Sequence, residues 1–261
     1  MSDLSGRTTI VVGASRGLGR GIATAFAAAG APVVAVSRTA TTFPEPRDGT
    51  GGTGGTGGTG GTIRTEIADA GDPTVAGSLL NRYEPETLIL VAGANPYMRP
   101  LQQQTWDTFS VNWHTDVRIT FHWLREVLLK PLRPGSRVVV FSSGAALNPG
   151  GSPLSGGYAG AKATQRLITG YAQEEASRAG LDITFSAVLP RFAPATGVGR
   201  PAVEAYAARA GRSFEDYLEQ LDYPLLTPEI AGTAIVELVK ADAATVAQSY
   251  GLTGAGLQKL P

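Results

Sequence analysis

Short, nearly continuous apolar runs recur along the chain, at residues 8–12, 32–37, 62–67, 87–92, 137–143 and 182–189. Runs of this length without polar alternation are typical of strands that are covered on both faces. Most of the intervals between them have helical periodicity. The first interval is closed by Gly30, a residue type that often ends helices. The alternation predicts an α/β fold, a Rossmann-type, doubly wound parallel sheet in a single domain over residues 1–261.

One interval departs from this periodicity. Residues 49–62 read GTGGTGGTGGTGGT and lie between the second and third predicted strands. Glycine is costly in a helix and threonine adds little helix propensity, so we expect a flexible loop where a crossover helix would normally lie. A phosphate cradle needs glycines in a tight turn that opens a helix, and this tract opens none. We interpret it as low-complexity filler and expect that halving it leaves turnover nearly intact.

Composition acts mainly by exclusion. The 22 basic residues balance the 22 acidic ones, and no basic run is present, so we expect neither a nucleic-acid nor a membrane partner. The chain contains no cysteine, which excludes disulfides, thiolate zinc sites and a cysteine nucleophile. The start MSDLSGRTTIVV lacks the pattern of a secretory signal, and no apolar run is long enough to span a bilayer. These features favour a cytoplasmic protein that binds small molecules or other protein chains.

Two further chemistries find little support in the sequence. His114 and His122 are eight residues apart, with no cysteine nearby and no evident third ligand, so we expect no metal site. No G-x-S-x-G motif surrounds any serine, which argues against a hydrolase on this architecture.

The glycines with the clearest structural logic follow the first strand, in VVGASRGLGRG. Gly13 would permit a tight turn, Gly17 would let the backbone approach a pyrophosphate, and Gly19 would allow close packing of the helix that follows. This turn is therefore the expected phosphate site. The residues that we expect to contact a cofactor here are Gly13, Ser15, Arg16, Gly17, Leu18 and Gly19.

The spacing G-x-x-x-G-x-G resembles that of the short-chain dehydrogenase/reductase family, and four more residues match the Asn-Ser-Tyr-Lys tetrad of that family. They are Asn112 in FSVNWHT, Ser143 in VVVFSS, and Tyr158 and Lys162 in YAGAK. The resemblance covers residues 5–190 well and 227–238 more loosely. It implies an enzyme that transfers hydride between a nicotinamide cofactor and a carbonyl or alcohol substrate, as a ketoreductase or alcohol dehydrogenase does.

The tetrad residues suit this chemistry. Tyr158 and Lys162 are four apart on a predicted helix, so they share one face, and a neighbouring ammonium favours the phenolate form of a tyrosine. In the reductive direction Tyr158 would give a proton to the carbonyl oxygen, while Ser143 would stabilise the charge that develops there. The resemblance further implies that Lys162 holds the nicotinamide ribose and that Asn112 positions a water molecule that relays protons.

The end of the second strand, Ser37-Arg38, indicates which cofactor is used. An NAD enzyme of this architecture usually has an acid there for the ribose 2′-hydroxyl, whereas a basic residue accommodates a 2′-phosphate. Arg16 could approach the same phosphate, and guanidinium groups suit phosphate oxygens. We therefore predict NADP(H). The resemblance adds the remaining expected cofactor contacts, which are Asp69, the first acid in ADAGDP, and Ala92, Gly93, Tyr158, Lys162 and Pro190.

Some positions depart from the family pattern. Val12 stands where Thr or Ser is usual, and Leu90 and Val91 replace two asparagines. Both changes remove side-chain hydrogen bonds that commonly brace the C-terminal edge of the sheet. Arg191 replaces the glycine of a Pro-Gly pair; it could bind a carboxylate or phosphate of the substrate, or face outward in a salt bridge.

Residues 191–226 lie where the family has its substrate lid, and the stretches around AVEAYAARA and FEDYLEQL are expected to be helical. The resemblance also implies a homodimer or homotetramer, with helices at about 103–130 and 157–179 in a shared interface. Two alternatives stay open. One is isomerase, dehydratase or cyclase chemistry on the same fold. The other is a non-enzymatic NADP-sensing or partner-binding protein, against which the complete tetrad argues.

Overall fold

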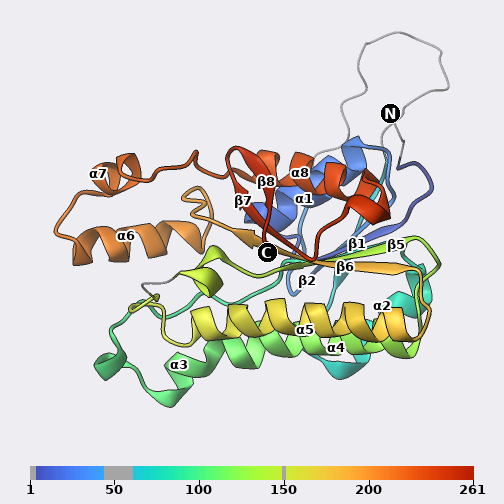
Figure 1. Cartoon of the computed structure of the whole chain (residues 1–261), viewed down its shortest axis with the longest axis horizontal. Helices are drawn as coiled ribbons and strands as arrows, with labels where there is room; N and C mark the ends of the chain where they lie inside the picture. Colours follow the sequence, from blue (N-terminus) through green and yellow to red (C-terminus); the bar gives the residue numbers. More distant parts are fainter. Residues whose placement is uncertain (1–3, 44–60, 149–150) are drawn as a thin grey trace, which may run out of the picture.

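The computed structural model describes residues 4–43, 61–148 and 151–261, which form a three-layer α/β domain around one sheet (Figure 1). The sheet has eight strands in the order β3-β2-β1-β4-β5-β6-β7-β8. The strands are β1 (Thr9–Val12), β2 (Val33–Ser37), β3 (Ile63–Ile67), β4 (Thr87–Leu90), β5 (Ser136–Phe141), β6 (Ile183–Pro190), β7 (Ser249–Thr253) and β8 (Gly256–Lys259). All neighbouring pairs are parallel except β7 and β8. The predicted Rossmann-type sheet in a single domain is confirmed.

Helices cover both faces of the sheet. They are α1 (Gly17–Ala28), α2 (Pro73–Tyr83), α3 (Trp106–Asn112), α4 (Arg118–Leu129), α5 (Tyr158–Arg178), α6 (Gly199–Arg209), α7 (Phe214–Glu219) and α8 (Pro228–Lys240). In Figure 1, α1 and α8 lie above the sheet, and α4 and α5 lie below it. Phe26 of α1 and Ile235 of α8 are buried in the upper core, whereas Leu79 of α2 and Trp123 of α4 are buried in the lower one. Both faces of the central strands are therefore covered, as their uninterrupted apolar runs require.

The predicted strands are all found, with bounds that differ by one or two residues. The strands β7 and β8 were not predicted, because SYGLT and GLQK are short and contain glycine or polar residues. As predicted, α1 ends just before Gly30, which has a positive φ of 92°. The two helices expected within 191–226 are present as α6 and α7, although the role of this segment as a lid stays a prediction. Apart from its last two residues, the glycine–threonine tract at 49–62 lies outside the described residues.

The continuous helix expected at about 103–130 is interrupted. Between α3 and α4 the chain makes a π-helical turn, η2 (Trp113–Val117), and Asn112 is the last residue before it. Such turns often occur at functional sites. Here the turn lies beside α5, and its Asp116 accepts a hydrogen bond from the amide of Ala94, in the loop after β4. The irregular backbone thus lies next to the carboxyl ends of the parallel strands.

Candidate active site

A cleft of about 1380 Å³ opens at the carboxyl ends of the strands, on both sides of β1 and β4. Ligands bind in open α/β sheets at this reversal of strand order. The volume exceeds the roughly 300–1,000 Å³ of a typical small-molecule site, so the cleft has room for a dinucleotide beside a substrate. Every residue predicted to contact the cofactor lines it, as do Ser143, Tyr158 and Lys162. The fourth tetrad residue, Asn112, is buried behind the wall of the cleft.

The glycine turn between β1 and α1 has the geometry that a phosphate cradle needs. Gly13 has a φ of 95°, and a side chain there would come within 2.5 Å of the backbone of Ala92. A Cβ at Gly19 would lie 2.2 Å from the carbonyl oxygen of Gly13. No acidic residue lies in the first turn of α1. The backbone amides at this helix N-terminus therefore favour an anion, which fits the pyrophosphate of a dinucleotide.

The far end of the same cleft has two cations without partners. Arg16 and Arg38 line it and are exposed, and no other described residue forms a hydrogen bond or ion pair with either guanidinium. Ser37 also lines the cleft, and its hydroxyl donates to the carbonyl of Thr39 at 2.7 Å. Asp69 accepts a hydrogen bond from the amide of Gly71 at 2.9 Å, so its carboxylate is held in the turn after β3. Two unpaired guanidinium groups at this end are suited to a phosphate.

Two hydroxyl groups with no acceptor of their own face the middle of the cleft. Ser143 follows β5, and its oxygen accepts from the amide of Ala145 at 3.2 Å, which leaves its proton free to be donated. Tyr158 is the first residue of α5, and no described residue forms a hydrogen bond with its hydroxyl. Its ring lies 5.5 Å from the ammonium of Lys162. Both hydroxyls can therefore donate to an oxygen atom of a ligand.

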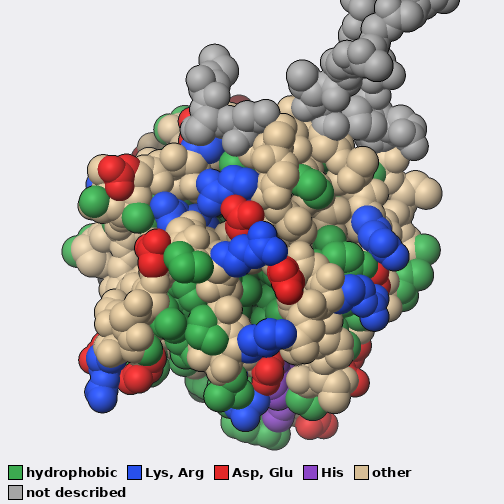
Figure 2. Space-filling view, turned by 90° about the vertical axis from the view of Figure 1, so that its right-hand side faces the viewer, with side chains coloured by type: hydrophobic (Ala, Val, Ile, Leu, Met, Phe, Trp, Pro, Cys, Tyr) green, Lys and Arg blue, Asp and Glu red, His purple; other side chains and the backbone are tan. Residues whose placement is uncertain are grey.

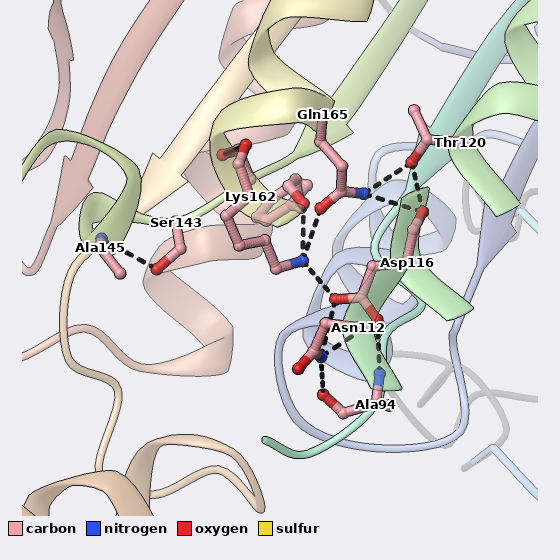
Figure 3. Close-up of polar contacts among 10 residues, drawn as sticks. Ala94, Asn112, Asp116, Thr120, Ser143, Ala145, Lys162 and Gln165 are labelled. Carbon is pink, nitrogen blue, oxygen red and sulfur yellow. Dashed lines mark hydrogen bonds and ion pairs between the residues drawn. The ribbon is translucent and has the colours of Figure 1, made fainter. Parts of the chain in front are cut away.

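Lys162 is held by a buried network of polar groups (Figure 3). Its ammonium forms an ion pair with Asp116 at 2.9 Å and donates to the side-chain oxygen of Gln165 at 2.8 Å. A third, longer contact of 3.4 Å goes to the carbonyl of Phe141. The Lys162 side chain is 6% exposed and that of Asp116 is fully buried. An ammonium has three donors, so the protein itself engages all of them.

The ion pair controls the protonation of Lys162. Burial alone would lower the pKa of Lys162, but the charge of Asp116, the interaction with Tyr158 and the Asp116 hydrogen bond together raise it above the ordinary value. A raised pKa means that the folded state binds the proton more tightly than the unfolded chain does. The resulting stabilisation is complete below the unfolded value of about 10.4 and is lost as the pH rises through the higher folded value. Lys162 is therefore an ammonium at neutral pH.

Asn112 connects this network to the loop after β4. Its amide nitrogen donates to the carbonyl of Ala94 at 2.8 Å and to both oxygens of Asp116 at 3.3 Å. Its own oxygen is buried without a partner in the described structure. A buried acceptor left without a donor costs about 1–3 kcal/mol, so a donor such as water is expected there. This fits the water-positioning role implied by the family resemblance, which stays a prediction.

Arg191 lies at the mouth of the cleft. A side chain on Gly144, the residue after Ser143, would lie 3.5 Å from its Cδ. Its guanidinium lies 4.8 Å from the ring centroid of Tyr223. Burial raises the pKa of Tyr223, and a hydrogen bond from Arg191 opposes that rise. Within the described part of the chain no carboxylate pairs with Arg191, so the salt bridge considered as an alternative is not found there.

The sequence interpretation missed Asp116, Gln165 and Thr120. The available signal was an acid four residues after Asn112, which is one turn further along the expected helix. Two features are absent from the described residues. No group of His, Asp or Glu side chains in the described part of the chain could hold a metal ion. No helix in that part is long and apolar enough to cross a membrane.

The fold and the cleft define a class, a Rossmann-type α/β protein whose cleft is lined by a glycine turn, a tyrosine and a lysine. Comparison with known proteins names the family: the model of the short chain dehydrogenases matches residues 7–206. The chain therefore belongs to the short-chain dehydrogenase family and is an oxidoreductase of that family. No curated protein matches the chain significantly.

Solved structures with the same fold are numerous but distant in sequence. A short chain dehydrogenase from Mycobacterium avium is 22% identical, with a TM-score of 0.72 over 100% of this chain and 86% of that one. A 3-oxoacyl (acyl-carrier-protein) reductase from Agrobacterium tumefaciens, with NADP bound, is 22% identical (TM-score 0.70; 97% and 95% covered). A 3-oxoacyl-[acyl-carrier protein] reductase from Brucella melitensis, in complex with NAD, is 19% identical (TM-score 0.72; 95% and 96% covered). These similar structures thus include both nicotinamide cofactors.

Proposed function

We propose that this protein is an NADP(H)-dependent carbonyl reductase or alcohol dehydrogenase. The observation that carries the proposal is the meeting of Ser143, Tyr158 and Lys162 in one cleft with the glycine turn. NADPH, when bound, supplies the hydride that is added to the carbonyl carbon. The preference for NADP(H) over NAD(H) is supported by the unpaired Arg16 and Arg38 at the end of β2 and the start of α1.

The side chains of the cleft account for the proton. Ser143 donates a hydrogen bond to the carbonyl oxygen and stabilises its developing negative charge. Tyr158 transfers its hydroxyl proton to that oxygen, so the carbonyl becomes an alcohol, and the phenolate is then reprotonated from solvent. The ammonium of Lys162, 5.5 Å from the ring of Tyr158, stabilises the phenolate in between. In the oxidative direction the same groups act in reverse.

The first test is consumption of NADPH by the wild type and by Tyr158→Phe, against a panel of aldehydes, ketones and quinones. We expect the wild type to oxidise NADPH with at least one of these compounds. Loss of the general acid should then lower kcat by about 10²–10⁴-fold. The matched control is Tyr83→Phe, which removes a hydroxyl bonded to Glu66 of the edge strand β3, outside the cleft, and should keep full activity.

Each outcome distinguishes the alternatives. If the wild type binds NADPH but none of the panel consumes it, isomerase, dehydratase or cyclase chemistry, or a sensing role, replaces the reductase assignment. If Tyr158→Phe keeps wild-type turnover with an active substrate, Tyr158 is not the proton donor.

We also propose a homo-oligomer built on α4 and α5, which lie side by side below the sheet (Figure 1). Phe121 and Leu129 of α4 and Leu167 and Tyr171 of α5 are each more than half exposed. Exposed apolar side chains gathered on adjacent helices are typical of protein interfaces. Light scattering coupled to size exclusion should give a dimer or tetramer, and Leu167→Glu should shift it towards the monomer. A monomeric wild type would contradict this assembly.

A further inference from the structure

Asp116 is a buried carboxylate that contacts two parts of the site at once (Figure 3). It lies on the π-helical turn η2 and is fully buried. One of its oxygens accepts from the amide of Ala94 at 2.8 Å, and the other pairs with the ammonium of Lys162 at 2.9 Å. Burying a carboxylate is costly unless it is paired and hydrogen-bonded. Both conditions are met here by residues of the candidate active site.

The lysine is fixed from the same turn in a second way. Gln165, which accepts from Lys162, donates through its amide nitrogen to the hydroxyl of Thr120 at 2.6 Å and to the backbone carbonyl of Asp116 at 3.3 Å. Both side-chain partners of the ammonium are therefore anchored by the segment that contains η2 and the start of α4. Contacts within the protein are therefore sufficient to fix the position of the Lys162 ammonium. To bind a ribose hydroxyl, the ammonium would have to give up its longest contact, the one to the carbonyl of Phe141.

The contact with Ala94 has its own reason in the sequence. Leu90 and Val91 stand where the family usually has two asparagines, and Leu90 is buried in the apolar core, so it offers no hydrogen bond to the loop that follows. Asp116 and Asn112 instead engage the amide and the carbonyl of Ala94. The approach is so close that a side chain on Gly93 would lie 2.7 Å from an oxygen of Asp116. The loop at 92–94 is therefore held by side chains of α3 and η2.

We propose that Asp116 is a positioning residue of the reaction, which serves as the fixed counter-ion of Lys162 and ties that lysine to the cleft-lining loop at 92–94. The effect of Asp116 on catalysis rests on the proposed function, in which Lys162 stabilises the phenolate of Tyr158. Among the residues that the structure describes, the ionisable groups that face Asp116 are Lys162 and, beyond it, Tyr158, both from α5. The neighbours from α3, α4 and β5 are neutral: Asn112, Thr120 and the carbonyl of Phe141.

The proposal predicts a change in the titration of Tyr158. Asp116→Asn removes the negative charge and leaves an uncompensated ammonium beside the tyrosine. The loss of a nearby negative charge lowers the proton affinity of the coupled Lys162 and Tyr158 pair, whichever of the two releases its proton first. If Lys162 keeps its proton, the phenolate signal of Tyr158 should therefore appear at lower pH. If Lys162 releases its proton first, Tyr158 loses its neighbouring cation and the signal should appear at higher pH.

The measurement is an ultraviolet titration of the protein without substrate. The signal of Tyr158 is the difference between the wild type and Tyr158→Phe, and in the variant background between Asp116→Asn and the double variant with Tyr158→Phe. The matched control is Thr120→Val, which disturbs the same network without changing its charge and should leave the titration in place. If Asp116→Asn lowers stability but leaves the Tyr158 titration where Thr120→Val leaves it, Asp116 is a structural residue only.

A second experiment covers the case in which Asp116→Asn folds but is too unstable to be titrated to high pH. Thermal unfolding is compared for Asp116→Asn, Lys162→Met and the variant with both changes. Since each single change leaves one buried charge unpaired, the double variant should unfold at a higher temperature than either single variant. If the losses in melting temperature simply add, the two side chains are not coupled and the proposal is wrong. Neither experiment needs a substrate, so both can fail or succeed independently of the reductase assignment.

Discussion

Exposed charged side chains are paired differently at the two ends of the parallel sheet. At the amino ends of the strands, acids and bases pair with one another on the surface: Glu86 pairs with Arg7 at 3.1 Å, and Arg133 pairs with Glu84 at 2.7 Å. Figure 2 looks at this end, where basic and acidic side chains alternate. At the carboxyl ends, by contrast, Arg16, Arg38 and Arg191 have no carboxylate partner in the described structure.

We infer from this difference that the charges at the amino ends interact with one another, whereas those at the carboxyl ends are available to a ligand. Surface pairs satisfy each other and contribute little to stability. Unpaired cations that line a cleft, next to a helix N-terminus, create a positive field that is suited to an anionic ligand. Variants at the two ends should therefore differ in kind: those at the carboxyl end should change binding, and those at the amino end should change almost nothing.

The largest of these effects is expected for Arg38→Ala. A charge-assisted hydrogen bond to a 2′-phosphate contributes about 1.5–3 kcal/mol. Its loss should weaken NADPH binding roughly tenfold to a hundredfold and leave NADH binding nearly unchanged. Fluorescence titration with the two cofactors measures the ratio. Arg178→Ala, an exposed arginine at the end of α5, is the matched control; an unchanged ratio in Arg38→Ala would remove the basis for the NADP(H) preference.

A smaller effect is expected for Arg191→Met, which keeps the aliphatic stem beside Gly144 and removes the charge. Because the guanidinium is exposed, its attraction for an anion should be worth about 1 kcal/mol at most. The KM for an oxo acid should rise by at most about fivefold, while that for its methyl ester should stay constant. If the acid and the ester respond alike, Arg191 does not recognise an anionic group and its role is its packing on Tyr223.

The fold was largely predictable because its strands are covered on both faces. In a chain whose apolar runs alternate with helical periods, a continuous run such as TLILVA is typical of a central parallel strand. The same reasoning failed for β7 and β8, which lie at one edge of the sheet. There Gly251 interrupts SYGLT, and Gln258 and Lys259 of β8 are exposed. Neither strand therefore forms a continuous apolar run in the sequence.

The candidate site was predictable only as far as its residues belong to short sequence motifs. Gly13, Tyr158 and Lys162 belong to local motifs whose spacing carries the chemistry. Asp116 belongs to none, because its contact with Lys162 depends on how a π-helical turn meets α5, 46 residues further along the chain. The sequence predicts one helix at about 103–130, and in a regular helix an acid at 116 would simply count as a polar position.

The smallest effect should follow from breaking the ion pair between Glu84 and Arg133 at the amino end. Both side chains are 62% exposed, so Glu84→Gln should lower the free energy of unfolding by at most about 1 kcal/mol. That corresponds to a melting temperature lower by about 2–4 °C at most for a domain of this size. NADPH binding should not change, because the pair lies at the amino ends of the strands and the cleft lies at their carboxyl ends. A substantial loss of NADPH affinity in Glu84→Gln, measured beside Arg38→Ala, would show that charge at the amino ends also acts on the ligand site, and the contrast between the two ends would not hold.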